Sequence, residues 1–434
     1  MTDFMEQPLE RAAAIAPPWL QDYMRAGRVR WEASSMPTRK TEQWKYTNLQ
    51  SLQPAYAAAS DGAMMLADAG IELPRFDAYR MVFINGHFSP AHSDSEVPAG
   101  VSIVRFADAD AAQAEQIRRH LGAAVGSDQP LFTALNDAGM AEGVFLDIEP
   151  RAHIERPLHV VWVSGNQSEA FSINQRLLVL CGESSRASVI EHFAGARGEQ
   201  QSFTNGVTEL LVETDASLNH YRLHLEEADA LHIGRVHARL GTRSTLNTFH
   251  MALGSVLKRI DLVVDFIGEG AHCEANGVYL PRGNEHIDYH TCMEHRAPNC
   301  TSSETFRGIV GGEATAVFNG RIHIHPDAQK TKAELSNRNL LTSNRAEVNT
   351  KPELEIYADD VQCAHGATVA QLDEMSLHYL RSRGVSRADA QMMLSTGFIN
   401  EVIDSIRCEG LRDYLQTLLS QRFARDPAML GNVS

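Results

Sequence analysis

The sequence has few cysteines, no long apolar run and no excess of basic residues. Its six cysteines are scattered over 434 residues without a C-x-x-C pair, which favours reduced thiols over a disulfide framework. No run approaches the ~18 consecutive apolar residues of a membrane span. The opening residues, MTDFME, contain two acids and no basic segment, so a secretory signal is not expected. These absences predict a cytoplasmic protein.

Several common active-site motifs are also absent. The chain has no G-x-x-x-x-G-K-[ST], no Rossmann glycine fingerprint, no H-E-x-x-H and no G-x-S-x-G, which excludes a P-loop ATPase, a dinucleotide-binding enzyme, a zincin and an α/β-hydrolase. The 39 basic residues are outnumbered by 55 acidic ones, giving a net charge of −16. An acidic surface repels phosphate backbones, so nucleic acid is not an expected partner, and neither is a membrane.

Hydrophobic periodicity divides the chain into three segments. Helical spacing marks the first ~60 residues and residues 107–125, whereas short β-branched runs separated by turn residues dominate from about Gly143. A helical pattern returns near Leu372, where Ser386 and Asp389 predict a capping box. We therefore expect a mainly helical domain over residues 1–140, a β domain over 141–371 and a helical domain over 372–434.

A tetrapeptide recurs within the β segment: a small residue, any residue, an apolar residue and Asn. The five Asn positions are Asn219, Asn247, Asn276, Asn319 and Asn349, separated by 28, 29, 43 and 30 residues. A near-fixed period of strand, turn and strand is typical of a β-solenoid, in which stacked coils bury their apolar faces only against neighbouring coils. The alternative is a β-sandwich in which the spacing is coincidental.

An apolar stripe runs along the C-terminal helical segment. Met392, Ile399, Val402, Ile403 and Ile406 fall on one side of the predicted helix. Such a stripe is usually core, but a small helical appendix on a solenoid has little core of its own. A protein partner docking on these five side chains is therefore a competing interpretation.

Two histidine-containing patterns could bind a metal. His323 and His325 share one face of a strand and resemble the metal pair of cupins, but the next glutamate, Glu334, follows later than that motif requires. A second set can be written as a zinc site, but it mixes both faces of a strand: His290, Cys292, His295 and Cys300. The favoured interpretation of both is polar residues at solenoid corners.

Cys363 and His365 form a third pair at positions i and i+2, near the end of the predicted solenoid. A thiolate and an imidazole on one face suit iron or zinc. A nearby imidazolium could also lower the pKa of the cysteine. Two ligands do not complete a coordination shell, so any metal here must be shared with another chain or held loosely.

Six segments resemble the SufB/SufD family of the SUF iron–sulfur cluster assembly machinery. They are Met36–Thr47 (MPTRKTEQWKYT), Val82–Gly86 (VFING), Ala316–Gly320 (AVFNG), Asn349–Val361 (NTKPELEIYADDV), Cys363–Val369 (CAHGATV) and Tyr379–Gly384 (YLRSRG). The long block from Asn349 to Val369 makes the resemblance specific, and it spans nearly the whole chain. SufB subunits are longer and differ at the C-x-H-G segment, so the chain is identified as a member of the SufD branch.

The resemblance implies a right-handed parallel β-helix flanked by helical domains, and a non-catalytic scaffold subunit. Its partners would be a SufB paralogue and the ABC-type ATPase SufC, docked on the C-terminal helices, with a homodimer possible for the isolated chain. It further implies that His365, with neighbouring Cys363, takes part in building a transient iron–sulfur cluster or holding iron at the SufB interface. No permanently bound cofactor is expected in the isolated chain, which has no four-cysteine cluster motif.

Two other functions compete with the scaffold. Parallel β-helices often belong to carbohydrate-active enzymes, in which Asp359 and Asp360 would supply the carboxylates. Against this stand the cytosolic N-terminus and the small aromatic content of 7%. The other alternative is a cupin-like mononuclear metal enzyme at His323 and His325.

Overall fold

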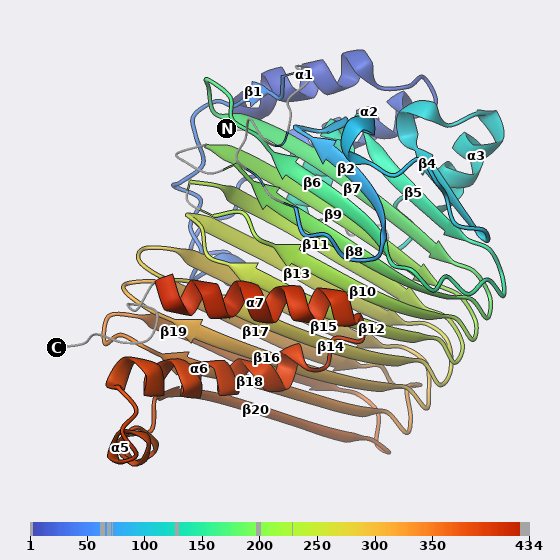
Figure 1. Cartoon of the computed structure of the whole chain (residues 1–434). Coiled ribbons are helices and arrows are strands. Elements are labelled where there is room, and N and C mark those ends of the chain that lie inside the picture. Colours follow the sequence, from blue (N-terminus) through green and yellow to red (C-terminus); the bar gives the residue numbers. More distant parts are fainter. Residues whose placement is uncertain are drawn as a thin grey trace.

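The chain folds into two mainly parallel sheets that face each other along a β-solenoid, with helices at its N-terminal end and along one side (Figure 1). The computed structural model describes residues 3–60, 66, 71, 73–125, 130–196, 201–227 and 229–425. The predicted β-solenoid between helical segments is confirmed. None of the described helices combines the length and apolarity needed to cross a bilayer.

Each coil of the solenoid contributes one strand to each sheet. Sheet A contains, in spatial order, β19 (Glu347–Ile356), β17 (Thr315–Ile324), β15 (His286–His295), β13 (Leu257–Phe266), β11 (Leu231–Leu240), β9 (Ser202–Val212), β7 (Phe171–Cys181), β5 (Gly143–Ile148) and β4 (Val101–Arg105), with β1 (Ala57–Ala58) beside β7. Sheet B contains β20 (Gln362–Gln371), β18 (Lys332–Leu341), β16 (Thr301–Val310), β14 (His272–Leu280), β12 (Thr245–Leu253), β10 (Ser217–His224), β8 (Arg186–Gly195), β6 (Leu158–Ser164), β2 (Tyr79–Ile84) and β3 (His87–Phe88). From β5 to β20, odd-numbered strands therefore lie in sheet A and even-numbered strands in sheet B.

The recurring asparagines have a structural reason, although they do not form a single ladder. Asn219 and Asn247 are in register on β10 and β12, and the amide of Asn247 donates to Asn219 Oδ1 over 3.0 Å. Asn319 and Asn349 instead lie on β17 and β19 of the opposite sheet. The 43-residue step between Asn276 and Asn319 thus marks the change from sheet B to sheet A.

The N-terminal helices cover the start of the solenoid. They are α1 (Glu6–Ile15), α2 (Gln21–Ala33), α3 (Ala111–His120) and α4 (Leu131–Gly139), with short 3₁₀ turns η1 (Asp3–Met5), η2 (Glu42–Trp44), η3 (Pro90–His92) and η4 (Phe106–Asp108). α4 is buried from Phe132 to Gly139 and contacts β7, β9 and β11. The helical region is shorter than the sequence pattern predicts, because the segment after Ala33 contains only the turn η2 before β1.

Two C-terminal helices, α6 (Arg387–Ile403) and α7 (Glu409–Arg425), lie along the outer face of sheet B (Figure 1). The preceding helix, α5 (Glu374–Ser382), packs against α6. Ser386 caps α6 as expected, because its hydroxyl accepts a hydrogen bond from the Asp389 N–H over 3.1 Å. The outer face of sheet B carries apolar side chains such as Tyr221 and Leu223, and these pack in one core cluster with α6 and α7. The helices therefore cover an outward apolar face that the solenoid alone would expose to water.

Candidate functional site

The solenoid has an open end formed by its last two strands. β19 ends the order of sheet A and β20 ends that of sheet B, and among the described residues no strand pairs with either of their outer edges. Large apolar side chains are exposed at this end, including Ile356, Tyr357 and Val369. An uncovered strand edge with exposed apolar groups is a template for pairing with another chain.

Cys363 and His365 lie on β20 at this open end. They are in register with Ala333 and Leu335 of β18, whose side chains are buried between the sheets. The two side chains thus share the inward face of the outermost strand, where Cys363 packs partly against the core and His365 is exposed. A partner that covers the open end would meet both groups.

The environment of Cys363 differs from one expectation drawn from the sequence. Burial raises the pKa of the Cys363 thiol above its ordinary value, opposed by a backbone hydrogen bond at Ala333. An imidazolium that lowers this pKa is therefore not what the structure shows. Neither Cys363 nor His365 belongs to a group of three or more ligand-type side chains within the described chain. Within the part of the chain that the structure describes, no third side chain joins this pair.

The predicted docking stripe needs a correction. Ile399, Val402, Ile403 and Ile406 are all buried, and they pack against the outer apolar face of sheet B. Met392 is half-buried at the edge of the same cluster. Sheet B itself occupies this surface of α6, because packing against the helix removes the outward apolar residues of the sheet from water. A partner of α6 must therefore contact the opposite side of the helix.

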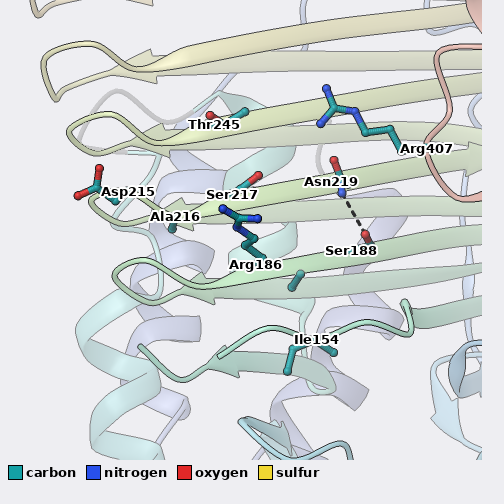
Figure 2. A pocket seen from close by; sticks show the side chains of 10 residues that line it. Ile154, Arg186, Ser188, Asp215, Ala216, Ser217, Asn219, Thr245 and Arg407 are labelled. Carbon is teal, nitrogen blue, oxygen red and sulfur yellow. Dashed lines mark hydrogen bonds between the residues drawn. The ribbon is translucent and has the colours of Figure 1, made fainter. Parts of the chain in front are cut away.

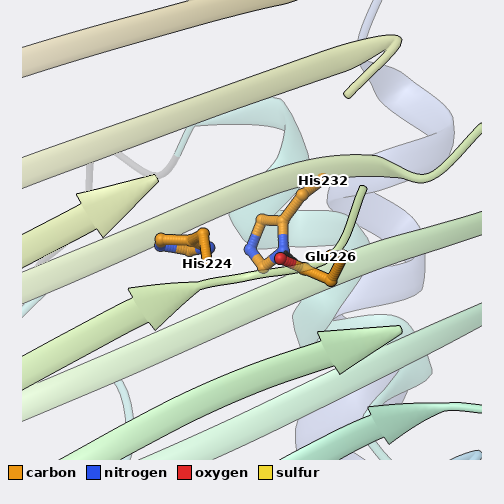
Figure 3. A group of neighbouring side chains, drawn as sticks. All are labelled: His224, Glu226 and His232. Carbon is orange, nitrogen blue, oxygen red and sulfur yellow. Dashed lines mark hydrogen bonds and ion pairs between the residues drawn. The ribbon is translucent and has the colours of Figure 1, made fainter. Parts of the chain in front are cut away.

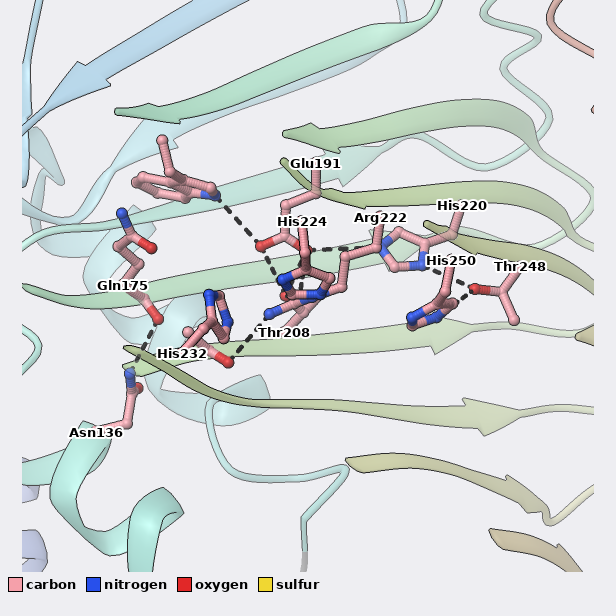
Figure 4. Close-up of polar contacts among 12 residues, drawn as sticks. Asn136, Gln175, Glu191, Thr208, His220, Arg222, His224, His232, Thr248 and His250 are labelled. Carbon is pink, nitrogen blue, oxygen red and sulfur yellow. Dashed lines mark hydrogen bonds and ion pairs between the residues drawn. The ribbon is translucent and has the colours of Figure 1, made fainter. Parts of the chain in front are cut away.

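The solenoid interior contains a polar cluster that sequence reasoning missed (Figure 4). On β10 the inward positions change from apolar Leu218 to His220, Arg222 and His224, all buried. Arg222 pairs with buried Glu191 over 2.6 Å, and Arg222 Nε donates to His224 Nε2. Burial lowers the pKa of His224 well below its ordinary value, so this imidazole is neutral. The signal in the sequence is the strand alternation itself, with polar residues at every second position after Leu218.

Part of this cluster has metal-ligand composition. His224, Glu226 and His232 present ligand atoms within 4.8 Å of one another (Figure 3). The carboxylate, however, already has a cationic partner, since Lys258 Nζ lies 3.3 Å from Glu226 Oε2. The guanidinium of Arg222 donates a hydrogen bond to His224 Nε2, so this nitrogen already has a cationic neighbour. Two buried cations at the ligand atoms do not fit a metal ion, so we assign these residues a structural role.

The other histidine patterns are resolved by the coil register. His323 and His325 meet Glu294 of the preceding coil, and the three present ligand atoms within 4.8 Å. The alternative zinc set does not come together. His290 and Cys292 lie on the outer face of β15, whereas His295 is buried with its ring stacked on Phe266 and Cys300 is buried with its thiol on a backbone carbonyl.

A shallow polar pocket of about 490 Å³ lies on the outer face of sheet B (Figure 2). It is floored by the ladder in which Asn219 donates to Ser188 Oγ over 3.1 Å, and Arg186 and Arg407 line it. Arg407 also donates to Asn247 Oδ1, which ties the link between α6 and α7 to the sheet. The pocket is thus part of the joint between the C-terminal helices and the solenoid.

Comparison with known proteins matches two family models to nearly the whole chain. The SUF system FeS cluster assembly SufBD core domain matches residues 163–398, and the SufBD protein N-terminal region matches residues 3–160. The core-domain match includes β20 with Cys363 and His365.

Curated relatives agree with these matches. The iron–sulfur cluster assembly protein SufD of Escherichia coli is 31% identical over 405 residues, covering 93% of this chain and 91% of the relative. An iron–sulfur cluster assembly SufBD family protein of Synechocystis is 30% identical, covering 89% and 87%. SufD of Bacillus subtilis is 24% identical, covering 68% and 67%.

Proposed function

Because the chain belongs to the SufBD family and is an iron–sulfur cluster assembly protein of the SUF system, we propose that it works in the cytoplasm as a non-catalytic scaffold subunit. In this role it pairs with a SufB paralogue and carries a SufC-type ATPase. It holds iron or a nascent cluster only transiently, at the interface with the paralogue. The observation that carries the proposal is the open end of the solenoid, where unpaired strand edges and two potential ligands coincide.

The open end suits a partner that is itself a β-solenoid. A chain with the same two-sheet cross-section can continue both sheets, or cover the inward faces of β19 and β20, without rearranging either partner. Val369 lies on the inward face of β20, and its side chain is 42% exposed. A partner that covers it would gain about 25 cal/mol of free energy for each Å² of apolar surface removed from water. The paralogue fits this description best, and a second copy of the chain could occupy the same end when the paralogue is absent.

The ligand chemistry at this end suits transient binding. His365 offers an exposed imidazole and Cys363 a half-buried thiol on the same face of β20. Neutral imidazole is a reversible ligand for iron, whereas tightly held clusters are ordinarily bound by four thiolates. This chain supplies the imidazole of His365, with the Cys363 thiol beside it, and partner residues would complete the shell. Separation of the partners would then release the iron or the cluster.

The ATPase has a different surface available from the one predicted. The outward side of α5 and α6 carries three exposed apolar side chains, Met375, Tyr379 and Met393. Gly397, on the same helix as Met393, is exposed, and a Cβ added there would meet open space. We propose that the partner ATPase contacts this outward side, while the stripe through Ile399 fastens α6 to the solenoid.

The proposal is tested by co-expressing the chain with its SufB and SufC partners and purifying the complex anaerobically. The variant Val369→Lys places a charge on the open end, and we expect it to lose the SufB partner while keeping SufC. Val29→Lys is the matched control, because Val29 is also exposed but lies on α2 at the other end of the chain. Retention of SufB by Val369→Lys, or equal loss with both variants, would refute pairing through this end.

A further inference from the structure

We infer that Glu294, His323 and His325 form a second metal site, for one divalent first-row transition-metal ion, on the outer face of sheet A. The glutamate comes from β15 and His323 from β17, where the two residues are in register on adjacent coils. His325 follows directly after β17. This site is separate from Cys363 and His365, which belong to sheet B. It therefore does not depend on the proposed scaffold function.

The three ligand atoms lie close together. Glu294 Oε2 lies 2.9 Å from His323 Nδ1 and 3.0 Å from His325 Nε2. Ligands at about 2.1 Å from a metal in cis octahedral positions are separated by roughly 3.0 Å, so these distances match adjacent corners of one coordination shell. The imidazole rings lie side by side with centroids 4.2 Å apart. All three ligand atoms lie within 4.8 Å of one another, so a single ion can reach them with small side-chain adjustments.

The carboxylate is oriented by groups behind it. Its other oxygen, Oε1, accepts hydrogen bonds from Arg321 Nη2 over 3.2 Å and from the Cys292 thiol over 3.3 Å. A ligating carboxylate in proteins is characteristically held in this way, by hydrogen bonds on the oxygen that does not bind the metal. Oε2 faces the two imidazoles and also accepts a long hydrogen bond from Arg296 Nη2 over 3.5 Å. Unlike the fully buried Lys258 beside Glu226, Arg296 is 47% exposed, so its guanidinium can turn toward solvent when an ion binds.

The contacts of His323 Nδ1 leave a place for a cation. This nitrogen lies 3.0 Å from Arg321 Nη2, which can only donate, and 2.9 Å from Glu294 Oε2, which as a carboxylate oxygen can only accept. No single protonation state of Nδ1 satisfies both neighbours. A metal ion satisfies the nitrogen and the carboxylate together, because both direct a lone pair at it. Arg321 retains a carboxylate partner in Glu355, 3.3 Å away.

The donor set and access identify the class of ion. Two imidazoles and one carboxylate suit divalent iron or zinc, whereas calcium and magnesium prefer oxygen ligands throughout. The side chains of His323 and His325 are 16% and 28% exposed, so the site has a route to solvent and room for water or a further ligand. Glu294 and Glu355 face the guanidinium groups of Arg321 and Arg296, so these four charges balance before an ion binds.

Cobalt binding to the full-length chain tests this site. The experiment uses metal-free protein carrying His365→Ala, which lacks the imidazole of the other proposed ligand pair. We expect this protein to bind one equivalent of Co²⁺ at neutral pH, as measured by calorimetry and by the visible absorption of bound cobalt. Glu294→Gln and His323→Gln should each weaken binding at least tenfold. His290→Gln is the matched control, since His290 lies on the same outer face of β15 and pairs with Asp288 instead. Displacement of cobalt by Zn²⁺ or by anaerobic Fe²⁺ identifies the preferred ion.

Circular dichroism establishes that each variant is folded before it is titrated, and His325→Gln replaces any variant that is not. Absence of saturable cobalt binding in the parent protein would overturn the inference and leave these residues as a surface ion-pair cluster. The same holds if Glu294→Gln and His323→Gln bind like the parent, or if His290→Gln weakens binding as much as they do.

Discussion

Lys258 and Glu226 form an ion pair inside the solenoid, with Nζ 3.3 Å from Oε2 and both side chains at most 2% exposed. Lys258 also donates to backbone carbonyls at Leu253 and His224, so the ammonium group is fully enclosed by acceptors. Burial raises the pKa of Glu226, but Lys258 and His232 outweigh it and hold that pKa at about 2. The pair lets a polar interior exist without an uncompensated charge.

Breaking this pair from one side should be costly. Lys258→Met leaves the Glu226 carboxylate buried without its cation, and we expect the free energy of unfolding to fall by about 3–5 kcal/mol. Urea unfolding measures the change. Asp215→Asn is the control, because its pair with Arg243 lies on the surface and should contribute at most about 1 kcal/mol. Equal stability of the two variants would contradict a role for the interior pair.

Glu304 should make the stability depend on pH. Burial raises the pKa of this interior carboxyl to about 8, only partly offset by the Thr291 hydroxyl. Between the unfolded-state pKa near 4.5 and about 8, the folded state holds a proton that the unfolded state has lost. Stability therefore falls as pH rises through this window, by at most about 1.4 kcal/mol per pH unit.

Glu304→Gln removes this dependence, because the amide does not titrate. We expect thermal unfolding to show little difference between the variant and the parent at pH 5 and a higher melting temperature for the variant at pH 8. Glu334→Gln is a suitable control, since Glu334 lies exposed on β18. A constant difference across the whole range would show that Glu304 is ionised in the folded state.

The solenoid is predictable from sequence because coil length determines which residues stack. Asn219 and Asn247 recur 28 residues apart and hydrogen-bond in register, so their spacing reflects a physical contact. The same pattern does not reveal the sheet to which a strand belongs. Asn319 and Asn349 match the tetrapeptide but occupy sheet A. A four-residue motif describes a local turn and strand, whereas the choice of sheet depends on the whole coil.

The same reasoning explains which site residues could be predicted. Cys363 and His365 share a face because strand geometry places residues i and i+2 together. Glu294 could not be paired with His323 from local spacing, since the two meet through a stacking offset of 29 residues. The stripe through Ile399 was visible, but amphipathicity does not say what covers an apolar face. The outward apolar residues of sheet B, which cover it, lie far away in the sequence.

The two sides of α6 should respond differently to substitution. Ile399→Ala removes a fully buried side chain from the joint with sheet B, and we expect a loss of about 2–5 kcal/mol in stability.

Gly397→Trp places a bulky side chain on the opposite, open side of α6, where an added Cβ would meet no other atom. The fold should persist, while the ATPase should no longer co-purify. Gly397→Ala is the control and should keep both, with a gain of about 0.5–1 kcal/mol from reduced unfolded-state entropy. Full ATPase binding by Gly397→Trp would place the docking surface elsewhere.

His365 and Cys363 should contribute unequally to cluster assembly. His365 is exposed on the outermost strand, so His365→Ala should leave the melting temperature and the assembly with SufB and SufC unchanged. The loss should appear as less iron and acid-labile sulfide on the complex purified anaerobically. Cys363 packs partly against the core, and burial raises its pKa, which disfavours the thiolate that binds iron.

We therefore expect Cys363→Ala to be the milder variant. The complex should retain its iron and sulfide, and the chain should lose a little stability because the Cys363 side chain no longer packs against the core. His378→Ala is the control for the histidine, because His378 is exposed on the neighbouring helix α5 and away from strand β20. Equal loss of iron in Cys363→Ala and His365→Ala would instead mean that partner binding lowers the pKa of the thiol and recruits it as a ligand. Unchanged iron and sulfide in His365→Ala would show that this histidine is not a ligand. Its imidazole is exposed on an edge strand, so the substitution should have no effect on folding that could compensate for the loss of a ligand.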